Sequence, residues 1–378
     1  MGTGFAGSAH VEALRRVPGV QVAALAASSA ERARAAADAL GIPGSTGDFR
    51  TLLEDPDIDC IHDCTPNDLR EAVTGAALDA GKHVLAEKPL GMDASQAAGL
   101  AGRAADADVV SGVCFNYRHF PLVAEARAML EDGRAGTPHL VRGGYLQDWL
   151  LDPTDWNWRL LSGRAGRSRA LADIGSHWID LAQHVTARRI TRVFARLGRL
   201  HDVRQRPAQA GTTFERGGPG GGEPLVVDTE DFATVLIELE GGCPGTFTVS
   251  QVTPGMRNRL TLEVDTAAVS LGWDQERPNT LWIGRRDVPN EQLLRDPGLL
   301  SPTAARLAHY PGGHQEGWAD ALKNLMLDFY ASVRAAGGGE RRETSVASFA
   351  DAHRVARTVD AILDSDRRER WVTVDPEP

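Results

Sequence analysis

Short apolar runs alternate with helix-like segments between residues 20 and 115, and this order constrains the fold more than any other feature. The apolar runs suit buried strands, and the alanine-rich segments carry leucine or valine at helical spacing. Such alternation predicts an α/β domain with a doubly wound parallel sheet. The predicted strands cover residues 20–26, 58–64, 83–86 and 109–115, and the predicted helices cover 30–40, 69–80 and 95–107.

In the second half of the chain, apolar and polar residues alternate instead. Residues 231–240 and 246–252 have the period of strands and are separated by a glycine-rich turn. This pattern predicts an α+β region on a large, mostly antiparallel sheet, with helices near 318–335 and 346–364. The glycine-rich segment 204–224 is predicted to be a surface loop without regular structure.

Size, charge and cysteine content exclude several classes. Because 378 residues with 42% apolar side chains exceed what one core usually absorbs, we expect two domains. A net charge of −10 makes nucleic acid and acidic membranes unexpected partners. The four cysteines lack disulfide-scaffold or zinc-site spacing, so no metal is expected. Without a long apolar stretch or a signal-like N-terminus, we expect a cytoplasmic protein.

The first residues match the glycine pattern of a Rossmann-type dinucleotide site, in which a tight turn and a helix N-terminus receive a pyrophosphate. This pattern normally follows the central strand, but only Met1 precedes it, so the first strand is apparently truncated. We expect that the chain starts at an internal methionine of a longer product; otherwise another segment fills the central position or the cofactor site is damaged. The predicted cofactor-binding residues here are Gly2, Thr3, Gly4, Phe5 and Ala6.

The expected end of the second strand lacks the acidic residue that binds adenosine ribose hydroxyls. It carries Ser28, Ser29 and Arg32 instead. Hydroxyls beside an arginine tolerate a ribose phosphate, and serines also serve NAD, so both NAD and NADP stay open, with NAD slightly favoured. Either serine also suits a helix N-cap.

Two short motifs carry the predicted chemistry. Lys88, one of three lysines, follows the strand 83–86 and so emerges at the carboxyl edge of the sheet, where ligands of α/β folds bind. Asp173 and His177 are four residues apart, which puts them on one face if the segment is helical, and a carboxylate there can orient an imidazole. Alcohol oxidation needs a base for the hydroxyl proton, which His177 suits, and Lys88 would stabilise the developing negative charge on oxygen. A surface lysine and a purely structural histidine are the alternatives.

Five motifs occur in order: the glycine pattern, Cys64-Thr65-Pro66-Asn67, Glu87-Lys88-Pro89, Phe115-Asn116-Tyr117-Arg118 and Asp173-Ile174-Gly175-Ser176-His177. By these motifs the chain resembles the Gfo/Idh/MocA family, which includes glucose-fructose oxidoreductase and inositol dehydrogenase, over nearly its whole length. The resemblance implies a dinucleotide-binding domain over 1–116 and a substrate-binding and oligomerisation domain over 117–378. It also implies a homodimer or homotetramer joined through the open sheet.

The resemblance assigns roles to particular residues. The implied catalytic set is Lys88, Asp173 and His177. The implied cofactor contacts are Cys64, Thr65, Pro66, Asn67, Glu87, Lys88, Asn116, Trp158 and Arg159. The chain departs from the family after Asn67, where Asp68-Leu69-Arg70-Glu71 replaces a frequent histidine.

Aromatic and polar residues before the Asp-His motif suggest a substrate with sugar-like rings, because C–H faces pack on aromatic rings while hydroxyls need hydrogen bonds. We expect oxidation of a secondary alcohol of a sugar, glycoside or cyclitol. The alternatives are an NAD-dependent glycosidase that oxidises its substrate transiently, and a non-catalytic nucleotide sensor. Core packing is the alternative role of the tryptophans. The candidate substrate residues are Arg118, Tyr145, Trp149, Asp173, His177 and His314, near Gln147, Trp156 and Trp158.

Overall fold

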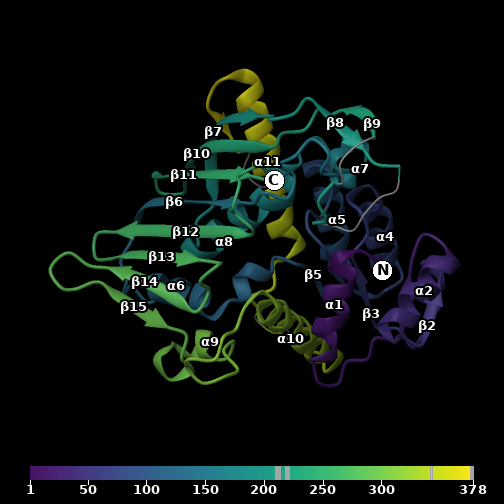
Figure 1. Ribbon diagram of the computed structural model, residues 1–378. Helices are drawn as coiled ribbons and strands as arrows, with labels where there is room; N and C mark the ends of the chain where they lie inside the picture. Colours follow the sequence, from purple (N-terminus) through teal and green to yellow (C-terminus); the bar gives the residue numbers. More distant parts are fainter. Residues whose placement is uncertain (209–213, 218–221, 341, 343, 375–378) are drawn as a thin grey trace. The chain divides into compact units, whose positions relative to one another are not determined.

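The computed structural model describes residues 1–208, 214–217, 222–340, 342 and 344–374 (Figure 1). The chain separates into two compact units. The first contains residues 1–116, 163–166 and 322–353, and the second contains the rest of the described chain. The expected division had placed every residue after 116 in one domain. The segment 322–353 joins the first unit because the Val113 N–H donates to the Ala347 carbonyl at 2.8 Å and the Tyr330 hydroxyl meets His62 at 2.9 Å.

The first unit is built on parallel strands with helices between them, which confirms the predicted Rossmann-type fold. One parallel pair joins β1 to β2, and a second group has the order β3-β4-β5. Met1 and Gly2 lie between the two groups, with the Cys64 N–H bonded to the Met1 carbonyl and the Gly2 N–H bonded to the Ala26 carbonyl. The strands are β1 (Ala24–Ala26), β2 (Gly44–Thr46), β3 (Cys60–Asp63), β4 (His83–Ala86) and β5 (Ser111–Val113).

One helix of this unit has a capping residue at each end. The helix predicted over 30–40 is α2 (Ala30–Leu40), which begins after the Ser29 side chain caps the Arg32 N–H and ends at Gly41 with φ of +60°. The other helices are α1 (Phe5–Arg15), α3 (Arg50–Glu54), α4 (Asn67–Asp79), α5 (Ala94–Asp106) and most of α10 (Trp318–Gly337).

The second unit contains one nine-stranded sheet with the order β15-β14-β13-β12-β6-β11-β10-β7-β16. All neighbours pair antiparallel except β6 and β11, which are parallel, so the predicted mostly antiparallel sheet is confirmed. Its strands are β6 (Pro138–Leu146), β7 (Ile190–Gly198), β10 (Phe232–Leu239), β11 (Cys243–Ser250), β12 (Arg259–Thr266), β13 (Ser270–Asp274), β14 (Thr280–Gly284), β15 (Glu291–Leu294) and β16 (Val372–Thr373).

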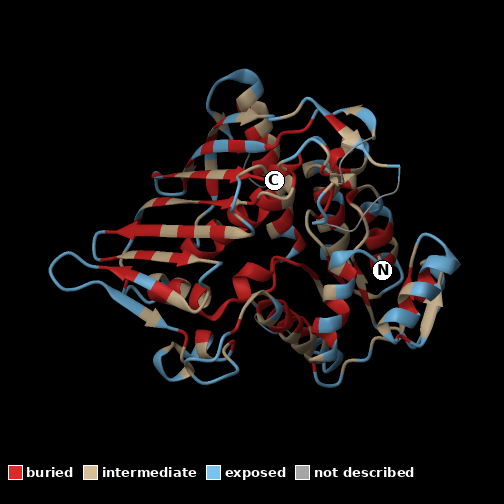
Figure 2. Ribbon diagram, in the orientation of Figure 1, coloured by how far each residue is buried: buried red, intermediate tan, exposed pale blue. Residues whose placement is uncertain are grey.

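Burial alternates along β10, so one face of this sheet is covered and the other is exposed (Figure 2). On the covered face Trp178 stacks on Phe247, with ring centroids 4.3 Å apart, and donates its indole N–H to the Thr261 carbonyl. Gly143 leaves room for this indole, since a Cβ there would lie 2.8 Å from its nitrogen. The helices of the unit are α6 (Pro121–Glu131), α8 (Ser176–Thr186), α9 (Pro302–Ala305) and most of α11 (Phe349–Arg368), whereas all but the first residue of α7 (Ser162–Ala165) belongs to the first unit.

The segment 204–224 differs from its prediction as an irregular loop. Its two ends belong to an antiparallel pair of strands, β8 (Val203–Arg206) and β9 (Glu223–Val226), which satisfy each other's backbone groups. The centre of the predicted glycine loop, residues 218–221, lies outside the described residues, as do 209–213. Within the described chain, every helix is too short or too polar to cross a membrane.

Candidate active site

The glycine turn at the start of the first unit has the shape that a dinucleotide needs. Gly2 has φ of +98°, and a Cβ there would lie 2.5 Å from the Cys64 carbonyl oxygen; a Cβ on Gly7 would lie 2.2 Å from the Gly2 oxygen. A Cβ on Gly4 would meet nothing within 4 Å, and no side chain caps α1. The first-turn amides of α1 therefore suit a pyrophosphate, as the sequence predicts for Gly2, Thr3, Gly4, Phe5 and Ala6.

Ser28, Ser29 and Arg32 gather at the end of β1. The Arg32 guanidinium donates to the Ser28 hydroxyl at 3.3 Å, and Ser29 caps α2. All three side chains are exposed. This arrangement offers hydroxyls and a positive charge to an adenosine ribose with or without a phosphate.

The loop after β3 is organised by a buried carboxylate and a buried guanidinium. Asp63 accepts from the Thr65 hydroxyl at 2.6 Å and from the Thr74 hydroxyl at 2.7 Å. Arg70 donates to the carbonyl oxygens of Thr65 and Pro89 and to the Asn67 side chain. Arg70 thus joins the Thr-Pro-Asn loop to the loop that follows Lys88.

Of the residues predicted to contact the cofactor, several have side chains engaged within the unit. Asn67 donates to the Ala165 carbonyl at 2.9 Å, and Glu87 binds His10. Asn116 is buried, and its Nδ2 has no partner among the described residues, which suits a donor to a cofactor.

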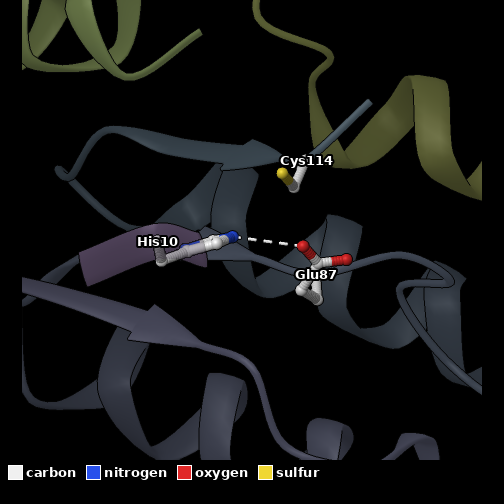
Figure 3. Close-up of side chains that lie close together, drawn as sticks. All are labelled: His10, Glu87 and Cys114. Atoms are coloured by element: carbon white, nitrogen blue, oxygen red, sulfur yellow. Dashed lines mark hydrogen bonds and ion pairs between the residues drawn. The ribbon is translucent and has the colours of Figure 1, made fainter. Parts of the chain in front are cut away.

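Glu87 directly precedes the catalytic candidate Lys88 and binds His10 of α1. The His10 Nε2 is 3.1 Å from the Glu87 Oε1, and the Lys88 backbone N–H donates to the Glu87 Oε2 at 3.2 Å. Figure 3 shows the imidazole and the carboxylate directed toward each other, with the thiol of Cys114 nearby. The His10–Glu87 pair therefore fixes the backbone at Lys88.

The charges of this pair follow from its surroundings. Burial opposes the charged imidazole, but Cys64, Cys114 and Glu87 outweigh that cost and hold the pKa of His10 well above its ordinary value. Burial also opposes ionisation of Glu87, yet the hydrogen bond and charge of His10, with Lys88 and Arg70, lower its pKa to about 2.

A charged His10 determines the proton positions in the next histidine. The two Nδ1 atoms of His10 and His62 are 2.9 Å apart, so His10 donates and His62 accepts. Burial and then the charge of His10 lower the pKa of His62 well below its ordinary value, so His62 is neutral. Its Nε2 then carries the proton that it donates to the Tyr330 hydroxyl.

In the second unit, Asp173 lies in a π-helical turn, Leu171–Gly175, that runs directly into α8. Its Oδ2 accepts from the Gln251 side chain at 2.9 Å, and its Oδ1 lies 3.2 Å from the Arg159 Nε. The Arg159 guanidinium also stacks on Trp158, 4.7 Å from the ring centroid. The carboxylate of Asp173 is therefore held from two sides, and π-helical turns frequently occur at functional sites.

Two buried acids hold the segment that leads into this turn. Glu230 accepts from the Arg169 and Leu171 backbone N–H groups, and burial raises its pKa. Asp231 binds the guanidinium groups of Arg169 and Arg204, and all three side chains are at most 1% exposed. We call Asp231, Arg169 and Arg204 the Asp231 cluster.

His177, in the first turn of α8, lies beside two tyrosine rings. Its ring meets the Tyr117 ring edge to face, with centroids 4.9 Å apart, and lies 6.2 Å from the Tyr145 ring. The two tyrosine hydroxyls are 2.6 Å apart, and the Tyr145 hydroxyl donates to the Asn258 side chain at 2.6 Å. Burial raises the pKa of Tyr117 to about 12 and that of Tyr145 well above its usual value, so both hydroxyls keep their protons.

Other predicted substrate residues take different places. Arg118 forms a buried bidentate pair with Asp180 of α8, with Nε and Oδ2 2.8 Å apart, so we assign it to holding this helix. Trp149 and Trp156 pack on the small apolar cluster Leu150, Leu160 and Val227. The Trp149 indole also donates to Gln147, whose amide donates to Asn258. His314 is exposed in a loop held by the buried Arg295–Glu316 pair.

Sequence reasoning missed four residues that organise these sites: His10, Arg70, Gln251 and Asn258. His10 carries a signal, because it lies on α1 just after the glycine pattern and is a polar residue in an apolar helix face. Arg70 lies where the family pattern departs. Gln251 and Asn258 lie at the end of β11 and before β12, and no local pattern marks them.

Comparison with known proteins identifies the two parts of the chain. Residues 1–115 match an oxidoreductase family with an NAD-binding Rossmann fold, and residues 123–270 match the GFO/IDH/MocA C-terminal domain. A levoglucosan dehydrogenase of Pseudarthrobacter phenanthrenivorans is 32% identical, over 99% of this chain and 97% of that protein.

Comparison with solved structures leads to the same family. A levoglucosan dehydrogenase complex with NADH and L-sorbose has a TM-score of 0.87 at 29% identity and covers 100% of this chain and 98% of its own. An inositol dehydrogenase homologue of Azotobacter vinelandii with NADH and myo-inositol has a TM-score of 0.84 at 28% identity, over 98% of this chain and 95% of its own. The chain is therefore an oxidoreductase with an NAD-binding Rossmann domain and belongs to the Gfo/Idh/MocA family.

Proposed function

We propose that this protein is a dehydrogenase that oxidises a secondary alcohol of a sugar, glycoside or cyclitol with NAD, or with NADP in its place. The observation that carries the proposal is the setting of His177, which lies beside two protonated tyrosines whose hydroxyls bond to Asn258. Such a ring of hydroxyl and amide groups suits a polyhydroxylated substrate. The names of the relatives, which include levoglucosan, L-sorbose and myo-inositol, support this class.

The reaction moves one hydride and one proton. The bound nicotinamide supplies the hydride acceptor for the carbinol C–H. His177 takes the hydroxyl proton as the C–O bond becomes a carbonyl, and Asp173 is the carboxylate proposed to stabilise the charged imidazole. Lys88 donates a hydrogen bond to the same oxygen and stabilises its developing negative charge.

The residues proposed to hold the dinucleotide come from the first unit. The amides that follow Gly2 and Gly4 would hold the pyrophosphate, and Ser28, Ser29 and Arg32 would hold the adenosine ribose. We also keep Cys64, Thr65, Pro66, Asn67, Glu87, Lys88, Asn116, Trp158 and Arg159 as proposed cofactor neighbours. Trp149 and His314 stay proposed substrate neighbours with Tyr145.

A substrate panel with matched variants tests this function. Sugars, glycosides and inositols are incubated with NAD or NADP, and the nicotinamide absorbance is followed. We expect His177→Ala and Lys88→Ala each to lower turnover by roughly 10²- to 10⁴-fold. The controls His139→Ala and Lys82→Ala remove an exposed histidine and a surface lysine and should leave turnover unchanged. Near-normal turnover of both site variants would refute the mechanism, and aglycone release without net NADH would indicate a glycosidase instead.

We further propose a homo-oligomer that covers the exposed face of the nine-stranded sheet. Phe232 and Leu236 of β10 lie on this face and are 37% and 46% exposed. Light scattering after size exclusion should give a dimer or tetramer, and Leu236→Glu should give a smaller species. A monomer for the unaltered chain would contradict this proposal.

A further inference from the structure

Three side chains of the first unit bring donor atoms of three chemical kinds together. The His10 Nε2, a Glu87 carboxylate oxygen and the Cys114 Sγ all lie within 4.8 Å of one another (Figure 3). They come from α1, from the residue after β4 and from the residue after β5. The expectation of no metal rested on cysteine spacing, which cannot reveal a set gathered from three distant positions. We call His10, Glu87 and Cys114 the three-donor site.

The backbone holds each of these positions in place. The Glu87 N–H donates to the Asp63 carbonyl and the Cys114 N–H donates to the Ala86 carbonyl, both at 2.9 Å. His10 lies in the middle of α1. His10 and Cys114 are 1% and 3% exposed, and the Glu87 side chain is 14% exposed. A site built on such elements is preorganised, so an ion would require only side-chain movement.

Two of the three donors also have the outer partners that metal ligands use. Metal-binding histidines usually donate their second ring N–H to another group, and metal-binding carboxylates are hydrogen-bonded as well. The His10 Nδ1 is 2.9 Å from the His62 Nδ1, and the Glu87 Oε2 accepts from the Lys88 backbone N–H at 3.2 Å. The atoms that remain for an ion, the His10 Nε2 and the Glu87 Oε1, face each other at 3.1 Å.

The donor set selects a class of ion. An imidazole, a carboxylate and a thiolate together suit zinc and ions like it, whereas magnesium and calcium require oxygen ligands. The ligands of a tetrahedral zinc ion, about 2.0–2.3 Å from the metal, stand roughly 3.3–3.8 Å apart. Separations of up to 4.8 Å therefore need to close by at most about 1 Å, which rotation of the side chains can supply.

The charge of the site favours a divalent ion. Without metal, the charged His10 and the ionised Glu87 cancel, and burial raises the pKa of the Cys114 thiol to about 12, so the site is neutral. A divalent ion would displace the Nε2 proton of His10 and the thiol proton of Cys114. The Glu87 carboxylate and the Cys114 thiolate then balance the two positive charges of the ion. The exchange therefore leaves no net charge in the interior.

We propose that His10, Glu87 and Cys114 form a binding site for one divalent ion of the zinc class, held by the imidazole Nε2, a carboxylate oxygen and the thiolate. The fourth position of a tetrahedral ion would remain for a water molecule. The ion would take the place of the proton that now joins His10 to Glu87, and the Glu87 Oε2 would still accept from the Lys88 N–H. The site is independent of the dehydrogenase activity proposed above.

Cadmium tests the site directly, because charge transfer from a thiolate to cadmium absorbs in the ultraviolet. The full chain is freed of metal with a chelator, titrated with Cd²⁺ and then challenged with Zn²⁺. We expect one ion per chain with the charge-transfer band, displaced by Zn²⁺ and unaffected by excess Mg²⁺. Cys114→Ser should lose the band and weaken the affinity by about 100-fold or more. The matched control Cys243→Ser removes an equally buried thiol of the second unit and should bind as the unaltered chain does.

Nitrogen chemical shifts give a second measurement that does not depend on a variant. In the unaltered chain, saturating Cd²⁺ should convert the His10 ring from an imidazolium to a neutral ring with Nε2 bound to the ion and the proton kept on Nδ1. A band that is absent from the unaltered chain or persists in Cys114→Ser, or a His10 ring that keeps its Nε2 proton at saturation, would overturn the proposal. Neither measurement uses turnover, so failure here and failure of the proposed dehydrogenase are distinguishable.

Discussion

The two units hold their catalytic candidates with different kinds of buried charge. In the first unit, the backbone at Lys88 depends on Glu87 and on a histidine, His10, whose charge is conditional on pH. In the second unit, the segment before Asp173 depends on Asp231 and two arginines, which stay charged at every ordinary pH. The difference implies that changes of pH act on the cofactor half before they act on the half that carries His177.

The largest loss of stability is expected from breaking the Asp231 cluster. Asp231→Asn removes the carboxylate that bridges the buried Arg169 and Arg204, so the free energy of unfolding should fall by about 3–5 kcal/mol. Urea denaturation measures this loss. The control Asp202→Asn removes an exposed partner of Arg199 and should cost less than about 1 kcal/mol. Equal losses in the two variants would show that the cluster is not a buried anchor.

A somewhat smaller loss of stability is expected when Glu87 becomes protonated at acid pH. Because its pKa is lowered from 4.5 to about 2, its contribution is complete above pH 4.5 and is lost as the pH falls toward 2. That contribution is roughly 3 kcal/mol, and it should be absent from Glu87→Gln. Urea denaturation of both proteins between pH 5 and 2 isolates it, since other carboxylates titrate in both. Parallel pH curves would mean that Glu87 is not ionised in the fold.

The pH dependence of stability is expected to have the opposite sign for His10. Its pKa is raised, so its contribution is complete below the ordinary value of 6.5 and is lost as the pH rises through the folded value. Nitrogen chemical shifts at pH 7.5 should show an imidazolium at His10 and a neutral ring at His62. A neutral His10 at that pH would remove the distinction between the two units.

The smallest effect is expected from an exposed ion pair on the nine-stranded sheet. Arg192 and Glu238 face each other at 3.3 Å across β7 and β10, both well exposed. Arg192→Gln should change the unfolding free energy by less than about 0.5 kcal/mol, and added salt should erase the change. A loss as large as that of Asp231→Asn would show that exposure does not separate the two kinds of pair.

Helices and strands could be predicted where the sequence carries a local signal. The helix 30–40 and the strand 83–86 carry both periodicity and clear ends, and they occur where the sequence predicts them. Strand β12 was missed, because one of its two partners, β6, is distant in sequence. The ends of 204–224 were predicted wrongly for the same reason, since β8 and β9 exist through their mutual pairing.

The candidate site divides in the same way. Lys88, Asp173 and His177 stand in short motifs, so they could be proposed from the sequence. The residues that hold this site in place could not be proposed in the same way. Gln251 binds Asp173 from 78 residues away in sequence, and Asn258 binds Tyr145 from 113 residues away. Contacts of this range leave no periodic trace in the chain.

The π-helical turn at Leu171–Gly175 has a consequence for tolerated changes of length. Upstream of it the chain is anchored to Glu230 and Asp231, and downstream it is continuous with α8. Each residue of a helix advances the side chains by about 100°. Deleting or inserting one residue in this turn would therefore rotate His177 by roughly a quarter of a circle relative to the anchored segment. The number of residues in this turn is therefore as strict a requirement as their identity.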